Sequence, residues 1–308
     1  MSVTHKIAVM FGGHSAEREV SLRSGQAVLN ALLEQGIDAH GFDPAEQPLL
    51  NLQRDGYDQV LIMLHGRGGE DGSLQGLLEQ LHIPYTGSGV LGSALGMDKV
   101  RTKQIIQTLG LPTATYRVVH KSSYDAGSCK DIMTSFGGAI MVKPALEGSS
   151  IGMAKVTTAE QLQQAIQDAF NYDKQVLLEQ YIEGDEFTVS ILHDKALPSI
   201  RMSTPREFYD YQAKYQADST QYFCPSGADE ATEALLGELA LAAFKAVGAS
   251  GWGRVDFMRD SNGQLYILEV NTVPGMTAKS LVPMAAKTAG LTFNQLVLAI
   301  LATAGLQK

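Results

Sequence analysis

The sequence predicts an α/β domain with a parallel sheet, followed by two α+β units. In the first ninety or so residues, apolar strand patterns alternate with helix patterns, which is the βαβ order of a parallel sheet. From about Met97 onward, strand patterns outnumber helix patterns. The length of 308 residues, set against a prior of roughly 150 residues per domain, suggests two or three structural units. We place their boundaries at residues 1–96, 97–183 and 184–308.

The first expected elements belong to the parallel sheet. The apolar run 7–11 indicates a buried strand that ends at Gly12-Gly13. Ser24 is expected to cap the next helix, whose apolar stripe ends before a stop at Gly36. A second strand at 59–64 runs into the glycine-rich segment 65–72 and a helix at 74–81. This order gives a parallel sheet with its loops at the strand ends.

The strands of the two later units follow a basic helix that contains Lys99, Arg101 and Lys103. Their apolar and β-branched runs predict strands at 113–120, 139–142, 153–157, 176–182, 187–192 and 251–258. A mixture of many strands and few helices is typical of α+β units.

Three further helices have recognisable ends. Thr158 and Gln161 form a capping box for a helix that ends near residue 170. A long helix is expected from a cap at Asp229 to a stop at Gly248, and a final helix at 293–304.

Composition excludes several classes of protein. The net charge of −9 argues against nucleic acid or an anionic membrane as the partner, because either requires a dominant basic surface. Two distant cysteines, Cys129 and Cys224, cannot build a disulfide framework or a Cys₄ metal site. The apolar runs at 7–11 and 296–302 are too short for a secretory signal or a membrane span. We therefore expect a cytoplasmic protein.

A β-hairpin near the C-terminus is the strongest single pattern. Asn262-Gly263 is the preferred two-residue turn between two strand patterns. With that turn, Val255 faces Val270 and Phe257 faces Leu268 on one face of the hairpin. These pairs predict an apolar packing surface between the strands.

The other face of the hairpin pairs Asp256 with Glu269 and Arg254 with Asn271. Two carboxylates directly opposite each other repel, so a cation is expected between them. Carboxylate and amide oxygens without histidine or thiolate are the ligands that Mg²⁺ prefers. Asp256, Glu269 and Asn271 are therefore the candidate ligands. A half-exposed sheet with one polar face shows the same pattern, so the hairpin alone leaves both interpretations open.

A second candidate site follows the strand at 139–142. Lys143 precedes the small-residue segment 147–152, where successive backbone N–H groups could converge on phosphate oxygens. The sequence contains no Gly-Lys pair, which excludes a Walker A loop. An ordinary turn has the same composition, so this loop alone does not decide the function.

Two other glycine patterns fail in their context. Gly148-x-Ser150-x-Gly152 fits the nucleophile elbow of serine hydrolases, but a strand rather than a helix is expected after it. The segment 87–92 fits a dinucleotide fingerprint, but the acidic residue expected about 20 positions later is missing.

Taken together, these residues resemble the D-alanine:D-alanine ligases of the ATP-grasp superfamily over nearly the whole chain. The segments that carry the resemblance are 12–13, 15–21, 65–72, 97–99, 143–144, 147–150, 209–215, 251–256 and 269–277. The resemblance implies an N-terminal α/β (pre-ATP-grasp) domain followed by a two-part ATP-grasp fold that clamps ATP. It further implies a homodimer that uses D-alanine as substrate, with two Mg²⁺ ions for which Mn²⁺ can substitute.

The resemblance also assigns roles on the nucleotide side of the site. It implies that Lys99 and Lys143 contact the phosphates and that Lys214 helps Lys143 to neutralise them. Glu179 and the backbone of Ile182 would hold the adenine. Glu186 would bind the ribose hydroxyls. The Mg²⁺ ligands would be Asp256, Glu269 and Asn271.

On the amino-acid side, the resemblance implies that Glu17 fixes the ammonium group of the first D-alanine. Ser149 and Tyr215 would be hydrogen-bonded to Glu17, and His65 would lie beside the substrate. The segment 209–215 is expected to close over the site as a lid, because an acyl phosphate must be kept from water.

The remaining roles concern the second D-alanine. Arg254 and the Gly275 N–H would stabilise the tetrahedral oxyanion, and Ser280 with the Leu281 backbone would hold the second carboxylate. Each assigned residue also has a purely structural interpretation; Lys99, for example, could lie on a solvated helix face.

Two other functions compete with this one. A D-alanine:D-lactate ligase would share every nucleotide-side residue, and Tyr215 favours the amine acceptor by resemblance. A nucleotide-binding regulator without catalysis is disfavoured, because it would not need Glu17, Ser149, Arg254 and Gly275 together.

Overall fold

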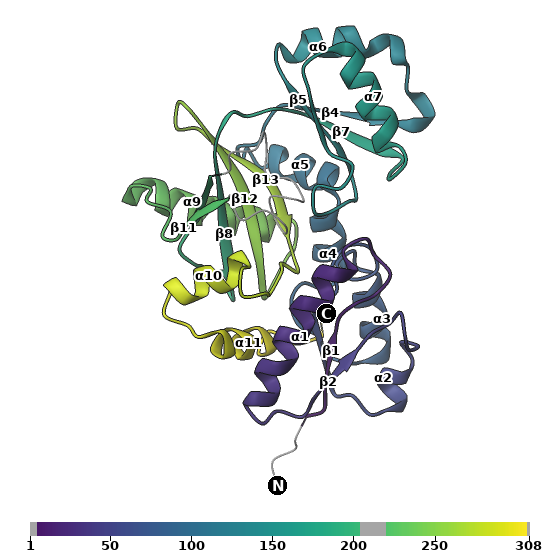
Figure 1. Ribbon diagram of the computed structural model, residues 1–308, viewed down its shortest axis with the longest axis vertical. Coiled ribbons are helices and arrows are strands. Elements are labelled where there is room, and N and C mark those ends of the chain that lie inside the picture. The colour runs from purple at the N-terminus through teal and green to yellow at the C-terminus, as the bar shows by residue number, and fades with distance from the viewer. Residues whose placement is uncertain (1–4, 204–219, 307–308) are drawn as a thin grey trace.

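Three sheets organise residues 5–203 and 220–306, the part of the chain that the computed structural model describes (Figure 1). A parallel three-stranded sheet lies at the N-terminal end, a four-stranded antiparallel sheet lies at the opposite end, and a six-stranded antiparallel sheet lies between them to one side. The α/β unit followed by α+β units is confirmed.

The first sheet has the order β2-β1-β3, with all strands parallel. Its strands are β1 (Ile7–Met10), β2 (Ala39–Phe42) and β3 (Gln59–Ile62). The helices that connect and follow them are α1 (Arg18–Glu34), α2 (Asn51–Arg54) and α3 (Ser73–Leu81). All four residues of β1 are buried, as expected for a central parallel strand covered on both faces. The short strand β2 was not predicted, because its two middle residues are exposed and interrupt the apolar pattern.

The start of α1 differs from the prediction. The helix begins at Arg18, so Ser24 lies inside it rather than at its cap. Ser24 is fully buried, and its hydroxyl accepts a hydrogen bond from the backbone N–H of Met276 at 3.0 Å. A serine in a helix interior can therefore have a partner outside the helix, which the local pattern does not reveal. The predicted stop at Gly36 is confirmed, with φ of +72° directly after the helix.

Two helices lead from the first sheet to the second, α4 (Val90–Met97) and α5 (Lys99–Thr108). The second sheet has the order β4-β7-β5-β6 and is antiparallel. Its strands are β4 (Tyr116–His120), β5 (Ile140–Pro144), β6 (Ala154–Val156) and β7 (Gln175–Gln180). Two 3₁₀ turns (Lys121–Ser123 and Ala126–Ser128) precede α6 (Cys129–Phe136), which covers one face of the sheet with α7 (Ala159–Ala169) (Figure 1). The capping box of Thr158 and Gln161 is confirmed at the start of α7.

The third sheet has the order β11-β10-β8-β12-β13, and β9 pairs with β8 at one end. Its strands are β8 (Gly184–Leu192), β9 (Lys195–Ala196), β10 (Ile200–Ser203), β11 (Gln221–Phe223), β12 (Trp252–Asp260) and β13 (Leu265–Asn271). The long helix α9 (Glu230–Ala246) packs on this sheet and buries a core with it. Its predicted cap, Asp229, accepts a hydrogen bond from the Thr232 N–H at 2.8 Å.

The β12–β13 hairpin has the predicted register only over Arg254–Asp256 and the residues that face them. The pairs Arg254–Asn271 and Asp256–Glu269 are confirmed, but Phe257 faces Ile267 rather than Leu268. The turn is one residue longer than predicted, since the Asp260 N–H bonds to the Gln264 carbonyl. A β-bulge between Asp256 and Phe257 offsets that extra residue.

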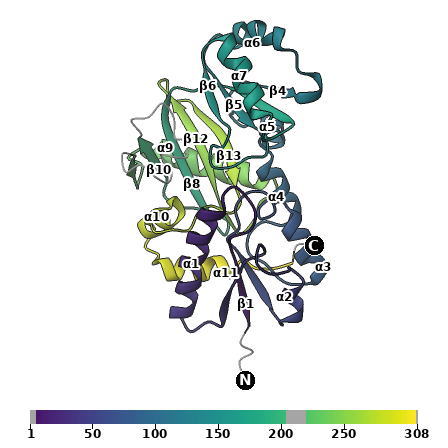
Figure 2. The same cartoon turned by 45° about the vertical axis from the view of Figure 1, so that its right-hand side comes forward.

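The last two helices, α10 (Leu281–Thr288) and α11 (Phe293–Leu301), bring the chain back to the first sheet (Figure 2). Leu296, Val297 and Ile300 of α11 share one buried core with β1 and α1. Among the described residues, no single helix has the length and apolarity of a membrane span. Taken together, α10 and α11 are long and apolar enough for a span by length and composition only, but the two helices are bent by 107° at the break between them.

Candidate active site

A cavity of about 260 Å³ lies between the second and third sheets. Strands β5 and β7 form one wall, and β8, β10, β12 and β13 form the other. Eight of the predicted site residues line it: Lys143, Glu179, Ile182, Glu186, Arg254, Asp256, Glu269 and Leu281. Met141, Met153, Met202, Met258 and Leu268 add apolar surface that the sequence analysis did not assign to the site.

The hairpin bulge explains why Leu268 lies in this cavity. With the predicted register Leu268 would have packed against Phe257, but the bulge leaves it unpaired beside Glu269. The predicted apolar packing surface is therefore formed by Val255, Val270 and Ile267, with Phe257.

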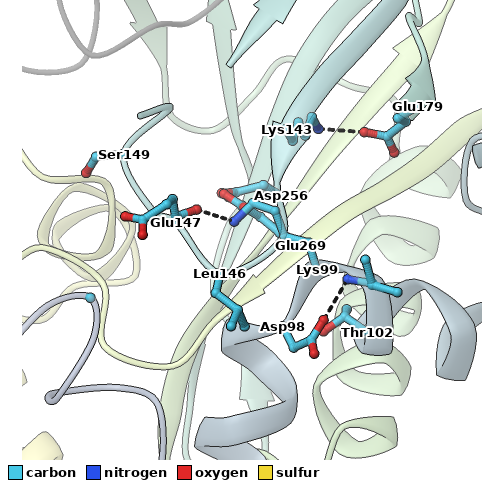
Figure 3. Close-up of polar contacts among 12 residues, drawn as sticks. Asp98, Lys99, Thr102, Lys143, Leu146, Glu147, Ser149, Glu179, Asp256 and Glu269 are labelled. Atoms are coloured by element: carbon cyan, nitrogen blue, oxygen red, sulfur yellow. Dashed lines mark hydrogen bonds and ion pairs between the residues drawn. The ribbon is translucent and has the colours of Figure 1, made fainter. Parts of the chain in front are cut away.

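A buried lysine and a buried carboxylate meet on the second sheet. The Lys143 Nζ donates to Oε2 of Glu179 at 2.5 Å, and Figure 3 shows the two side chains pointing toward each other. The other oxygen, Oε1, forms an ion pair with Lys103 of α5, which is fully buried. Burial alone would raise the pKa of Glu179, but Lys143 and Lys103 outweigh it and hold that pKa below its ordinary value.

Asp256 and Glu269 lie side by side (Figure 3). Each is paired with a cation of the protein. Arg254 donates to both oxygens of Asp256 at 2.7 Å, and the Thr188 hydroxyl donates to Oδ1 at 2.6 Å. Glu269 lies 3.0 Å from the Nζ of Lys99. The repulsion predicted between the two carboxylates is thus reduced by side chains of the protein itself.

Lys99 connects this acidic pair to the small-residue loop. Its Nζ also donates to the carbonyl of Glu147 at 2.8 Å. Burial would lower the pKa of Lys99, but the attraction of Glu269, Glu17 and Glu70 outweighs it and raises that pKa. Lys99 is therefore not on a solvated helix face, although Arg101 of the same helix is exposed.

A second contact joins the N-terminal sheet to the small-residue loop. Glu17 is buried at the start of α1, and the Ser149 hydroxyl donates to its Oε1. Two glycines make room for the carboxylate, because a Cβ on Gly66 or Gly148 would lie 2.9 or 2.6 Å from its Oε2. Ser149 has φ of +49°, a left-handed conformation that costs a non-glycine residue about 1 kcal/mol. The predicted pairing of Glu17 with Ser149 is present in the structure.

His65 and Glu70 lie close to Glu17 in the glycine-rich loop after β3. The Nδ1 of His65 is 2.8 Å from the Val273 carbonyl, and burial lowers the pKa of the ring, although Glu17 opposes this. Glu70 accepts the Gly66 N–H at 2.8 Å. Burial, together with the charge of Glu17, raises the pKa of Glu70 to about 8. Glu70 was not predicted as a site residue, because its burial depends on how the loop folds.

The residues predicted for the second amino acid lie at the start of α10. The Ser280 hydroxyl accepts the Thr277 N–H at 2.9 Å, and a Cβ on Gly275 would lie 3.1 Å from the same hydroxyl oxygen. Gly275 and Ser280, to which separate roles were assigned, are therefore neighbours. The predicted residues Lys214 and Tyr215, and the whole lid segment 209–215, lie outside the described residues.

Arg67 was not predicted as a site residue, yet it joins two units. Its Nε donates to Glu147 at 3.0 Å, and its Nη2 donates to the Tyr172 carbonyl at 3.2 Å. Both partners belong to the second unit, whereas Arg67 lies in the loop after β3. Neighbouring residues gave no signal for this contact, because its partners are about 80 and 105 positions away.

Comparisons with known proteins identify the family of the chain. The family described as D-ala D-ala ligase C-terminus matches residues 105–302, and D-ala D-ala ligase N-terminus matches residues 40–88. A D-alanine–D-alanine ligase of Pseudoalteromonas atlantica is 67% identical over 300 residues, covering 97% of this chain and 94% of that relative. The chain belongs to the D-alanine–D-alanine ligase family. Another such ligase, of Pseudoalteromonas translucida, is 59% identical over 297 residues and covers 96% of both chains.

Solved structures of this ligase family share the fold. A D-alanine–D-alanine ligase from Bacillus anthracis has a TM-score of 0.87 at 35% identity, covering 97% of both chains. A structure of the Bacillus anthracis ligase complexed with ATP has a TM-score of 0.85 at 32% identity, again over 97% of both chains. The VanG D-Ala:D-Ser ligase from Enterococcus faecalis has a TM-score of 0.84 at 30% identity and covers 97% of this chain and 99% of that one.

Proposed function

We propose that the protein joins two D-alanine molecules into D-alanyl-D-alanine through an acyl phosphate. It is an ATP-dependent, ADP-forming ligase whose product is a precursor of peptidoglycan. The curated relatives are D-alanine–D-alanine ligases, so they do not favour D-lactate as the second substrate. The observation that carries the proposal is the Glu17–Ser149 contact, because it joins the amino-acid end of the site to the loop beside Lys143.

ATP would occupy the cavity between the second and third sheets. Its apolar methionine walls suit a flat base, and Glu179 and the Ile182 backbone would hold the adenine. Glu186 would bind the ribose hydroxyls. Lys143 and Lys99 would contact the phosphates, together with Lys214 from outside the described residues.

Asp256, Glu269 and Asn271 would hold Mg²⁺, and Mn²⁺ could substitute for it. The described residues contain no group of three or more His, Cys, Asp or Glu placed to hold a metal. Two adjacent carboxylates and an amide oxygen still fit Mg²⁺, since this ion commonly completes its shell with water and substrate phosphates. Bound there, it would neutralise charge on the phosphate oxygens during transfer.

In the first step, a carboxylate oxygen of the first D-alanine attacks the γ-phosphorus of ATP. The new O–P bond replaces the bond to ADP, which leaves, and an acyl phosphate is formed. Glu17 would orient this D-alanine by binding its ammonium group, with Ser149 and Tyr215 fixing the carboxylate of Glu17. Phosphoryl transfer is catalysed mainly by holding both reactants in position and by electrostatic stabilisation of the transferred group.

In the second step, the amine of the second D-alanine attacks the acyl carbon and phosphate leaves. Arg254 and the Gly275 N–H would stabilise the tetrahedral oxyanion, which lowers the barrier most when the donors are already in place. Ser280 and the Leu281 backbone would bind the carboxylate of the attacking molecule. The proposed lid at 209–215 would keep water from the acyl phosphate.

The unit boundaries at 1–96, 97–183 and 184–308 remain part of this proposal. They are supported by the position of Met97 at the end of α4 and of Gly184 at the first residue of β8. A cytoplasmic location fits the two free cysteines, Cys129 and Cys224. A homodimer is proposed from the family resemblance alone.

The proposed function is tested by measuring phosphate release from ATP with D-alanine, with L-alanine and without amino acid. We expect release only with D-alanine, accompanied by the dipeptide. D-Lactate and D-serine, each added with D-alanine, test the second position, and we expect neither to be incorporated in preference to D-alanine. Equal phosphate release in all three reactions would exclude the ligase.

A further inference from the structure

Lys103 of α5 is a fully buried cation to which the proposed mechanism gives no role. Its Nζ pairs with Oε1 of Glu179 and also contacts the Thr113 hydroxyl. The Tyr116 ring lies over the same Nζ, with its centroid 5.5 Å away. Lys103 does not line the cavity, whereas Glu179 and Lys143 both do. It therefore contacts Glu179 from the protein side.

The carboxylate of Glu179 is thus held by two lysines that differ in one respect. Lys143 faces the cavity and donates to Oε2, so a bound nucleotide can compete with Glu179 for it. Lys103 is enclosed by α5, β4 and β7 and can keep its contact with Oε1. Burial lowers the pKa of Lys103, and the attraction of Glu179 opposes that change.

Charge balance explains why two lysines would be needed. A buried carboxylate without a counter-ion is strongly unfavourable. If Lys143 were the only partner of Glu179, moving it to the triphosphate would leave such a carboxylate behind. With Lys103 in place, Lys143 can move while Glu179 remains paired.

We propose that Lys103 is a positioning residue that neutralises Glu179, so that Lys143 can leave this carboxylate and bind the phosphates of ATP. The inference rests on the proposed function, because that function assigns Lys143 to the phosphates. Lys103 would touch neither ATP nor the reacting atoms. If Lys103 only stabilised the fold, its replacement would change the affinity for ligands with and without phosphates to the same extent.

The test compares ATP with adenosine as ligands of the purified full-length protein. In Lys103→Met, we expect the dissociation constant of ATP to rise about tenfold to a hundredfold, the range for losing one charged hydrogen bond. Adenosine should change by less than about threefold, because it has no phosphates for Lys143 to bind. Equal weakening of both ligands, or of neither, would overturn the inference.

Two further variants complete the design. Arg101→Met removes an exposed cation from the same helix and should leave both dissociation constants unchanged. Lys103→Met combined with Glu179→Gln removes both buried charges, and it carries the test if the single variant does not fold. Its ATP affinity should lie within about threefold of Glu179→Gln alone, because Lys143 then has no carboxylate to leave. An additional tenfold loss would show that Lys103 does not act through Glu179.

The wild-type protein separates the two possible failures. If it neither binds ATP nor releases phosphate with D-alanine, the proposed function is wrong. If it does both while Lys103→Met binds ATP as tightly as the wild type, only the role of Lys103 is wrong.

Discussion

Replacing Ser24 with alanine should damage catalysis more than it damages folding. Ser24 accepts the backbone N–H of Met276 at 3.0 Å, and both residues are fully buried. The Met276 N–H follows directly after Gly275, whose own N–H is proposed to bind the oxyanion. Alanine would leave the Met276 N–H buried without an acceptor. The loop at 272–280, between β13 and α10, would then be held less firmly.

The size of both effects can be worked out from this single contact. An unsatisfied buried donor costs about 1–3 kcal/mol, and the higher helix propensity of alanine offsets about half a kcal/mol of that. At about 2–4 °C per kcal/mol, the melting temperature should fall by a few degrees. Losing one oxyanion donor costs about 10²–10³ in kcat, so a loop that only partly misplaces Gly275 should cost about tenfold to a hundredfold.

The measurements are kcat with saturating ATP and D-alanine, and thermal unfolding of the same samples. Ser93→Ala is the control, since Ser93 is also a buried helical serine with a hydrogen bond to the backbone; its hydroxyl donates to the carbonyl of Ser88 at 3.2 Å, whereas that of Ser24 accepts from an N–H. The Ser93 hydroxyl bonds to Ser88 rather than to the segment that contains Gly275, so its variant should lose stability but keep kcat. If Ser24→Ala and Ser93→Ala lose stability equally and both keep kcat, the loop does not depend on Ser24.

Three further predictions concern the loops and the acidic pair. Arg67→Ala should raise the KM for ATP by no more than about fivefold, because Arg67 is half exposed and such ion pairs contribute at most about 1 kcal/mol. High salt should reduce the difference in KM from wild type, and a difference that grows with salt would contradict this. Asp256→Asn should raise the Mg²⁺ concentration needed for half-maximal activity at least about tenfold, as measured by titrating chelator-treated protein; an unchanged requirement would exclude Asp256 as a ligand. The pKa of Glu70 is raised from 4.5 to about 8, so the folded protein holds a proton that the unfolded chain releases, and stability should fall as pH rises through this range. Glu70→Gln should flatten that fall in a series of melting temperatures, and parallel curves would show that another group is responsible.

The hairpin shows how far a local pattern can be trusted. The predicted facing of Asp256 with Glu269 is correct, although it was derived from a two-residue turn that the protein does not have. The longer turn shifts the register by one residue and the bulge shifts it back before Asp256. The sequence predicted the strands because their apolar pattern is local. It could not predict the bulge, whose extra residue, Leu268, is apolar like its neighbours.

The residues that were missed share a different property. Lys103, Glu70 and Arg67 are polar, and nothing in their neighbouring residues distinguishes them from solvated side chains. Their roles depend on contacts with distant segments, such as that of Lys103 with Glu179. Lys99 and Lys103 are four residues apart on α5, so they lie on one helix face. The sequence shows that spacing. It does not show that this helix face is buried, because the burial depends on how the second sheet packs against α5.

One helix links the two ends of the proposed site. Glu17 and Ser24 are seven residues apart, about two turns, which places them near the same side of α1. Glu17 contacts Ser149 of the second unit, and Ser24 contacts the loop at Met276 in the third. The return of α11 to the core of the first sheet supports α1 from behind (Figure 2). The first and second amino acids would therefore be positioned relative to each other by a single rigid element, and a change at either residue should affect the use of both substrates.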